Sequence, residues 1–143
     1  MRSVLRAAAT SVAVLLATGG CNSPLAPGDF TLDGQWEGRG FPYGLALDLN
    51  QDQDNAVSGE GELRGLRVVP ITGTERADTV ISTRTAVDVS GRWRYPAFRL
   101  TLSQDEFADI QLAGTFSGPD SVNVTLTGSG FNGAAITLVR AAD

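Results

Sequence analysis

The chain has 143 residues, 42% of them hydrophobic and 19% charged, which is the size and composition of one globular domain with one core. It carries 16 acidic residues against 11 basic ones, all of which are arginine, and it has no histidine and one cysteine. These absences exclude Ser-His-Asp and Cys-His catalysis, Schiff-base chemistry on lysine, and zinc sites that need histidines or several cysteines.

The N-terminal segment has the pattern of an export signal. Arg2 and Arg6 provide a positive end, and the apolar run that follows, from Ala7 to Thr18, is about 12 residues long. A run of this length is shorter than the roughly 20 residues that a membrane-spanning helix needs. We therefore expect it to be cleaved rather than retained.

The single cysteine follows this run directly, after two glycines. Small residues before a cysteine resemble the lipobox of bacterial lipoproteins, in which the cysteine receives a diacylglycerol and becomes the first residue of the mature chain. The resemblance implies lipidation of Cys21, although Thr18 stands where such boxes usually have leucine, and an ordinary secretory signal is the alternative. It predicts an exported, lipid-anchored protein of the bacterial cell envelope, at the outer membrane or facing the periplasm.

These features divide the chain into three parts. Residues 1–20 are predicted to be a lipoprotein signal peptide, residues 21–32 the lipidated cysteine and a flexible tether, and residues 33–143 the folded domain. The mature chain keeps nine arginines against 16 acidic residues, a net charge of −7. Such an acidic domain is a poor partner for nucleic acid, and we expect it to meet the membrane through the lipid on Cys21.

The folded domain shows the alternation of hydrophobic and polar residues that is typical of half-buried strands. In YGLALDLNQ, Leu45, Leu47 and Leu49 share one face while Asp48 takes the other. No segment of a dozen residues has a helical apolar stripe. Comparable alternating runs, separated by the turn-forming stretches QDQDN, SGPD and FNG, cover residues 56–63, 98–103, 108–118, 121–130 and 134–140.

This meander of roughly eight or nine strands predicts an all-β fold, an antiparallel up-and-down β-barrel of about eight strands. About twenty sizeable apolar side chains, Ile71 among them, are predicted to face inward. An interior of this kind is either filled by its own side chains or holds one small ligand. Glycines on the predicted inner face, where they allow the sheet to bend and close, occupy positions 59, 61, 73, 114 and 128.

Gly34 and Trp36 at the head of the first strand, with Arg140 on the last, resemble the calycin-type barrels of the lipocalin, avidin and fatty-acid-binding superfamily. In those barrels the first-strand tryptophan packs at the closed end and an arginine from the last strand lies across it. The resemblance implies that Trp36 and Arg140 form a structural, barrel-closing pair. The region is shorter than a lipocalin and lacks a long late helix, and no avidin-type biotin motif follows Trp36, so biotin binding is not expected.

Phe41 and Tyr43 follow the first strand in a predicted loop and are candidates for the mouth of a ligand site. In barrels of the resembling kind, loops at the open end frame the ligand. The alternative is that both aromatic rings fold over the end of the barrel as a plug.

A second candidate for the ligand mouth is the stretch GRWRYPAFR, in which Arg92 and Arg94 interleave with Trp93 and Tyr95. Arginine beside exposed aromatic rings is suited to an anionic head group or a sugar. The simpler interpretation is strand packing, because alternation puts the two aromatic residues on one face and the two arginines on the other.

The acidic residues offer no convincing catalytic or metal site. NQDQDN resembles a calcium loop only superficially, because Asn55 stands where such a loop needs glycine and Gly61 where it needs glutamate. A solvated hairpin turn is the better interpretation. The adjacent pair Asp105 and Glu106 is expected to be solvated as well. We therefore predict no enzyme activity, no metal and no cofactor.

The sequence thus favours an envelope lipoprotein whose small barrel binds an apolar or amphipathic small molecule. The alternative is a structural or protein-interaction barrel, inhibitor-like in its use of loops, that contacts an envelope protein and holds no small ligand.

Overall fold

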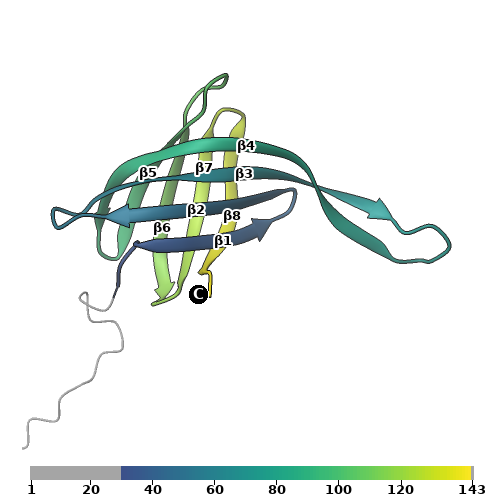
Figure 1. Ribbon diagram of the computed structural model, residues 1–143, viewed down its shortest axis with the longest axis horizontal. Helices are drawn as coiled ribbons and strands as arrows, with labels where there is room; N and C mark the ends of the chain where they lie inside the picture. The colour runs from purple at the N-terminus through teal and green to yellow at the C-terminus, as the bar shows by residue number, and fades with distance from the viewer. Residues whose placement is uncertain (1–29, 143) are drawn as a thin grey trace, which may run out of the picture.

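The computed structural model of the protein describes residues 30–142, which form one closed antiparallel barrel (Figure 1). Each strand pairs with the next along the chain, and the first strand pairs with the last. The predicted all-β, up-and-down barrel is confirmed, and no helix occurs within the described range. The strands are β1 (Gly34–Gly40), β2 (Tyr43–Gln51), β3 (Ala56–Pro70), β4 (Ala77–Arg94), β5 (Ala97–Ser103), β6 (Ile110–Gly118), β7 (Ser121–Gly128) and β8 (Phe131–Arg140).

The alternation in the sequence determines which side chains enter the barrel. In β2, Leu45, Leu47 and Leu49 are buried, whereas Asp48 is exposed. Eighteen buried hydrophobic side chains, drawn from every strand, form a single cluster in the interior. Burying one large apolar side chain stabilises a fold by about 1.5–3 kcal/mol, so this cluster is the main source of stability.

Gly114 on β6 shows how the interior accommodates an inward glycine. The ring of Phe98 from β5 occupies the space into which a Cβ at this position would project, so the missing side chain leaves no gap. Two other predicted inner glycines are placed wrongly. Gly73 lies in an exposed turn, and Gly128 is exposed at the end of β7 with φ +85°, a conformation that suits glycine.

The packed part of the chain begins earlier than the predicted boundary at residue 33. Phe30 and Leu32, which the sequence analysis assigns to the tether, are only 3% and 1% exposed. Both are apolar and two residues apart, and Leu32 has the same parity as the inward-facing Trp36. That continuation of the alternating pattern is the signal that could have moved the boundary.

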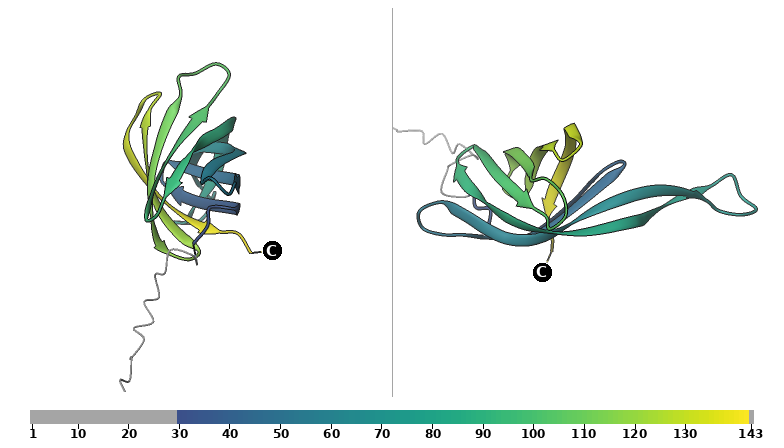
Figure 2. Two further views of the ribbon diagram at one scale, coloured as in Figure 1. Left: turned by 90° about the vertical axis from the view of Figure 1, so that its left-hand side faces the viewer. Right: turned by 90° about the horizontal axis from the view of Figure 1, so that it is seen from above.

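β3 and β4 continue beyond the barrel as a two-stranded arm, defined here as residues 66–81 (Figures 1 and 2). A bulge between Gly65 and Leu66 marks the point where the arm leaves the barrel. Ile71, predicted to be a core residue, lies at the far end of the arm and is 45% exposed. The prediction is wrong here because Ile71 follows the last paired residue of β3, where no barrel interior is available.

Candidate functional site

Trp36 on β1 and Arg140 on β8 are direct neighbours across the seam where the first and last strands pair. The tryptophan is 1% exposed, and the guanidinium carbon of Arg140 lies 4.3 Å from the centroid of its ring. A cation–π contact of this kind contributes about 0.5–2 kcal/mol, depending on how well water is excluded. The structure therefore brings together the two residues to which the resemblance assigns a barrel-closing role.

The guanidinium of Arg140 is occupied by structural contacts. It donates hydrogen bonds to the carbonyl oxygens of Thr31, at 2.9 Å, and Asp33. It also donates to a carboxylate oxygen of Asp120 at 3.0 Å. These bonds tie the start of the packed chain to the last strand and to the β6–β7 turn.

Trp36 helps to hold the same N-terminal segment. Its indole N–H donates to the carbonyl of Leu32 at 2.9 Å, and the backbone N–H of Leu32 donates to the Gln51 side chain at 2.9 Å. Both bonds satisfy groups that lie at or near the buried core. The segment thus closes this end of the barrel as part of the fold.

Aromatic rings fill the closed end around Phe116 of β6. Its centroid lies 5.1 Å from that of Phe30, 6.3 Å from Trp36, 6.2 Å from Trp93 and 6.0 Å from Phe98. All four pairs are edge-on and fall within the 4.5–7 Å range of favourable ring contacts. The end of the barrel beneath Trp36 is therefore packed with rings.

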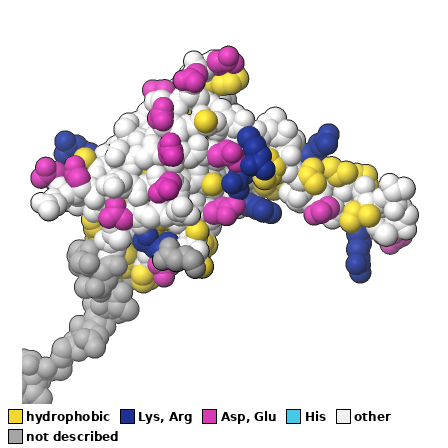
Figure 3. Space-filling view, viewed as in Figure 1, with side chains coloured by type: hydrophobic (Ala, Val, Ile, Leu, Met, Phe, Trp, Pro, Cys, Tyr) yellow, Lys and Arg dark blue, Asp and Glu magenta, His cyan; other side chains and the backbone are white. Residues whose placement is uncertain are grey.

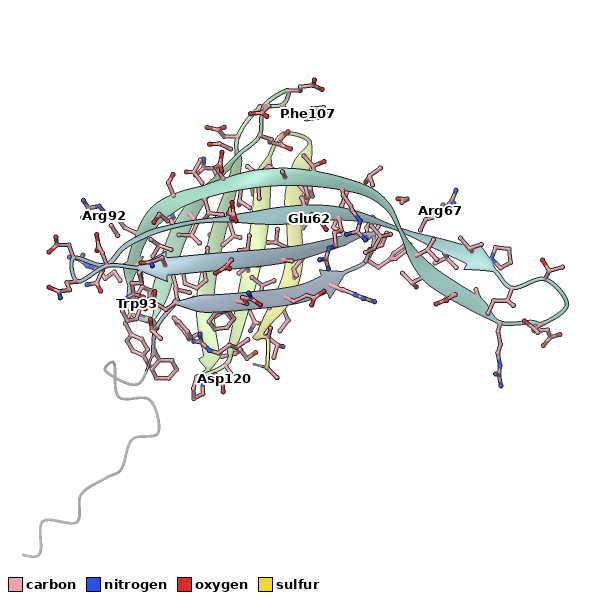
Figure 4. All side chains as sticks on the ribbon, viewed as in Figure 1. Glu62, Arg67, Arg92, Trp93, Phe107 and Asp120 are labelled. Carbon is pink, nitrogen blue, oxygen red and sulfur yellow. The ribbon has the colours of Figure 1, made fainter. Side chains whose placement is uncertain are left out.

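The GRWRYPAFR stretch is divided between two faces as strand alternation requires. Trp93 packs against the core and Tyr95 against Phe30, with ring centroids 5.1 Å apart in the second pair. Arg92 and Arg94 are exposed on the other face. Figure 4 shows Arg92 and Trp93 at the end of the barrel away from the arm, pointing to different sides. The buried indole nitrogen of Trp93 has no hydrogen-bond partner in the described part of the chain.

Phe41 and Tyr43 lie at the opposite end, where the arm begins. Phe41 is 66% exposed in the β1–β2 turn, so it does not plug the barrel. Tyr43 is half-buried at the start of β2, and its ring packs edge-on against Phe131 at 4.7 Å between centroids. The turn is joined to the arm by a hydrogen bond from the backbone N–H of Leu66 to the carbonyl of Pro42.

The six predicted mouth residues therefore do not form one site. Phe41 and Tyr43 stand at the arm end, whereas Trp93 and its neighbours stand at the closed end. In an up-and-down barrel the turns alternate between the two ends, so separating these segments requires the exact number of strands between them, which a prediction of eight or nine strands left open. The Tyr43–Phe131 pair covers the core at one end, and the rings around Phe116 cover it at the other.

The outer face of β1 to β4 is acidic (Figure 3). Asp48 on β2, Glu60 on β3 and Asp88 on β4 stand opposite one another in a row across the sheet. They line a hollow of about 460 Å³ on the outer surface. Like charges directly opposite each other on neighbouring strands are destabilising, so this row weakens the sheet at neutral pH.

A mixed network lies beside that row. Arg64 donates to Glu62 at 2.7 Å and to Glu37 at 2.6 Å, and Arg84 donates to Glu62 at 3.1 Å. The hydrogen bond from Arg64 lowers the pKa of the Glu62 carboxyl, and the same bond raises the pKa of Arg64. This network holds paired acidic and basic side chains on the outer face of β3, next to the root of the arm.

The remaining acidic candidates lie in loops. The carboxylate of Asp52 accepts hydrogen bonds from the backbone N–H groups of Asp54 and Ala56, which closes the β2–β3 turn. Asp105 and Glu106 are exposed between β5 and β6. Within residues 30–142, no three side chains of His, Cys, Asp or Glu are gathered as they would be around a metal ion. The same range contains no helix with the length and hydropathy to cross a bilayer.

The predicted lipidation site, Cys21, and the predicted signal peptide lie outside the described residues. Comparisons of the chain with protein-family models, with curated proteins and with solved structures found no match.

Proposed function

We propose that this chain is an exported barrel that acts as a binding module for another protein, and that the arm is its contact surface. The arm itself is the observation that carries the proposal. Two-stranded hairpins are marginally stable alone, so an arm of residues 66–81 that extends away from its barrel gains stability from a partner that covers it.

The side chains of the arm support contact with an apolar surface. Val68 is 49% exposed and Ile71 45%, and Phe41 at the root of the arm is 66% exposed. These are three of the five large hydrophobic side chains that are exposed in the described residues. Figure 3 shows apolar side chains along the length of the arm, with arginines projecting from it. Exposed apolar groups that gather in one region mark interaction surfaces.

The backbone of the arm supports the same proposal. β2 pairs with β3 only as far as Gly65, and β5 pairs with β4 only from Asp88. Along the arm each strand therefore has one neighbour, and its outer edge offers unpaired N–H and C=O groups. A partner that adds a strand to such an edge gains main-chain hydrogen bonds.

Carriage of an apolar molecule inside the barrel is the other function that the sequence raises. The interior holds eighteen buried hydrophobic side chains, and aromatic rings cover it at both ends. This filling favours the interaction module over the carrier.

We further propose that the barrel is a bacterial lipoprotein anchored in the envelope through Cys21, and a distant relative of the lipocalin-like barrels. The N-terminal sequence pattern supports the anchor. The contact between Trp36 and Arg140 supports the kinship.

Site-specific photo-crosslinking in cells that produce the protein naturally tests the interaction module. A photoreactive residue is placed at Val68 or Ile71 on the arm, and at the exposed Thr127 on β7 as the matched control. The proposal expects an adduct of one discrete mass, with the same protein partner, from both arm positions and not from position 127. Adducts that are equal at all three positions, or absent from the arm, would overturn it.

Native mass spectrometry of the purified protein separates the two candidate functions. A bare polypeptide is the result that the interaction module predicts. A stoichiometric apolar molecule that copurifies would instead identify a carrier barrel, whatever the arm contacts.

A further inference from the structure

A second hollow lies on the other side of the barrel from the acidic face. Figure 2 shows β5 to β8, in green and yellow, on the side opposite β1 to β4. The hollow has a volume of about 540 Å³ and is formed by the outer surfaces of β5 to β8 and the edge of β1. Its size is within the range of small-molecule sites, about 300–1,000 Å³.

The charge of this hollow is opposite to that of the chain. The protein has 16 acidic residues and a net charge of −5, yet no carboxylate lines the hollow. β6 and β7 contain no charged residue. Arg39 on β1 and Arg99 on β5 line opposite margins. Neither guanidinium forms an ion pair or a hydrogen bond within residues 30–142, whereas Arg64, Arg84 and Arg140 all do.

The floor of the hollow is made of short hydroxyl and amide side chains in register. Thr115, Asn123 and Thr137 stand side by side on β6, β7 and β8, and Arg39 follows Thr137 on β1. The Thr137 hydroxyl donates to the side-chain oxygen of Asn123 at 3.0 Å, which orients the amide. The amide N–H groups and the threonine hydroxyls provide hydrogen-bond donors and acceptors along one line.

A second row runs beside the first and ends in the other arginine. Arg99 is followed in register by Ala113, Thr125 and Ala135. The alanines leave the space above them open. The first row ends at Arg39 on β1 and the second at Arg99 on β5, so the two arginines stand at opposite margins of the hollow. β1 and β5 are four strand spacings apart, so the two arginines are separated by about 19 Å across the strands, and a ligand that reaches both has to be extended.

These features select a hydroxylated anion. Guanidinium groups bind carboxylates through paired hydrogen bonds, and rows of hydroxyl and amide groups suit the hydroxyls of sugars. Phe98 is the only aromatic residue that lines the hollow, and it is 4% exposed, so no ring is available for stacking. Because no ring can stack on the ligand, attraction between the arginines and the anionic groups of the ligand has to supply much of the binding affinity.

We propose that this hollow, defined by Arg39, Arg99, Thr115, Asn123, Thr125 and Thr137, binds an extended anionic oligosaccharide of the uronic-acid type. The two arginines hold carboxylates near the two margins, and the threonine and asparagine side chains bond the sugar hydroxyls between them. The site uses no residue of the arm.

Isothermal titration calorimetry of the full-length protein with tetragalacturonic acid tests the proposal. Maltotetraose, which is neutral and of similar length, and a short poly-glutamate peptide serve as comparison ligands. We expect binding of the uronic-acid oligomer and a steep loss of affinity as salt increases. Each of Arg39→Gln and Arg99→Gln should weaken binding several-fold, and the double variant should weaken it by about tenfold or more.

Arg76→Gln is the matched control, because Arg76 is exposed between β3 and β4 at the far end of the arm, its guanidinium is unpaired within the described residues, and it lies away from the hollow. It should leave the affinity unchanged, as should removal of the arm. Absence of binding, equal binding of maltotetraose, or equal loss in the Arg76 variant would overturn the proposal. Equal binding of poly-glutamate would overturn it in favour of an acidic peptide site.

Discussion

The guanidinium of Arg140 covers the ring of Trp36 and at the same time donates hydrogen bonds to the backbone carbonyls of Thr31 and Asp33. One side chain on the last strand therefore connects the first strand, the segment that precedes it and the β6–β7 turn. Because these contacts join both ends of the described chain, we expect them to control the stability of the barrel.

Replacement of this arginine should be costly. Arg140→Gln removes the contact over Trp36 and the hydrogen bonds to Thr31, Asp33 and Asp120. The expected loss is about 2–3 kcal/mol in the free energy of unfolding, measured by urea denaturation. Arg92→Gln, at an exposed arginine without such bonds, should change stability by less than about 0.5 kcal/mol. Similar losses in the two variants would contradict the role assigned to Arg140.

The two tryptophans should respond differently to loss of the indole N–H. Trp36→Phe leaves the carbonyl of Leu32 without its donor and opens space in the core, so about 2–4 kcal/mol should be lost. Trp93→Phe removes a buried N–H that has no partner, which offsets part of the lost packing, and about 1 kcal/mol or less should be lost. Thermal unfolding of both variants checks the order, and the reverse order would refute it.

Removing the central charge of the acidic row, that of Glu60, should stabilise the fold. Glu60→Gln removes the charge that faces both Asp48 and Asp88, and should raise stability by about 0.2–1 kcal/mol at neutral pH and low salt. High salt should diminish the gain. Asp54→Asn in the β2–β3 turn is the control, because that side chain faces no opposing strand. A gain of equal size there would point to net charge rather than to the row.

The Glu62 network should give stability a dependence on acid pH. Because the hydrogen bond from Arg64 holds the pKa of Glu62 below its ordinary value of 4.5, the network stabilises the fold above pH 4.5. The contribution is lost as the pH falls through the lowered pKa. Chemical denaturation of the protein and of Glu62→Gln across the acid range should show a difference that shrinks toward low pH. A constant difference would exclude this linkage.

The arm should be dispensable for folding. Gly65 and Thr83 are paired neighbours on β3 and β4, so an Asn-Gly turn that replaces residues 66–82 can close the hairpin at that point. The shortened protein should keep its β-sheet circular dichroism and unfold within a few degrees of the parent. If the barrel fails to fold without the arm, the arm is a structural element and not a docking device.

The alternating pattern was sufficient to predict the class, direction and approximate number of strands. From Leu45 to Leu49 in β2, and from Val122 to Leu126 in β7, every second residue is buried, and period-2 burial requires no knowledge of neighbouring strands. Closure rested on the inward glycines and on the resemblance at Trp36 and Arg140, because pairing of the first and last strands is a long-range relationship that alternation does not report.

The arm could not be predicted in the same way. Alternation reports which face of a strand is polar, but it does not report whether a third strand lies alongside. The bulge after Gly65 also shifts the pattern, so that Leu66 is buried three residues after the partly buried Leu63, where strict alternation would not place it. The second hollow was missed for a related reason, because only the strand register places Arg39 beside Thr137 and Arg99 in the row that leads through Ala113 to Thr125.

The bonds of Thr31, Leu32 and Asp33 also have a mechanical meaning. A pull exerted through the chain before Phe30 meets Arg140, Gln51 and Trp36 together, so several bonds share the load instead of breaking one after another. The N-terminal end of the described chain is therefore held by bonds to the first, second and last strands at once, and a load applied there is divided among all three.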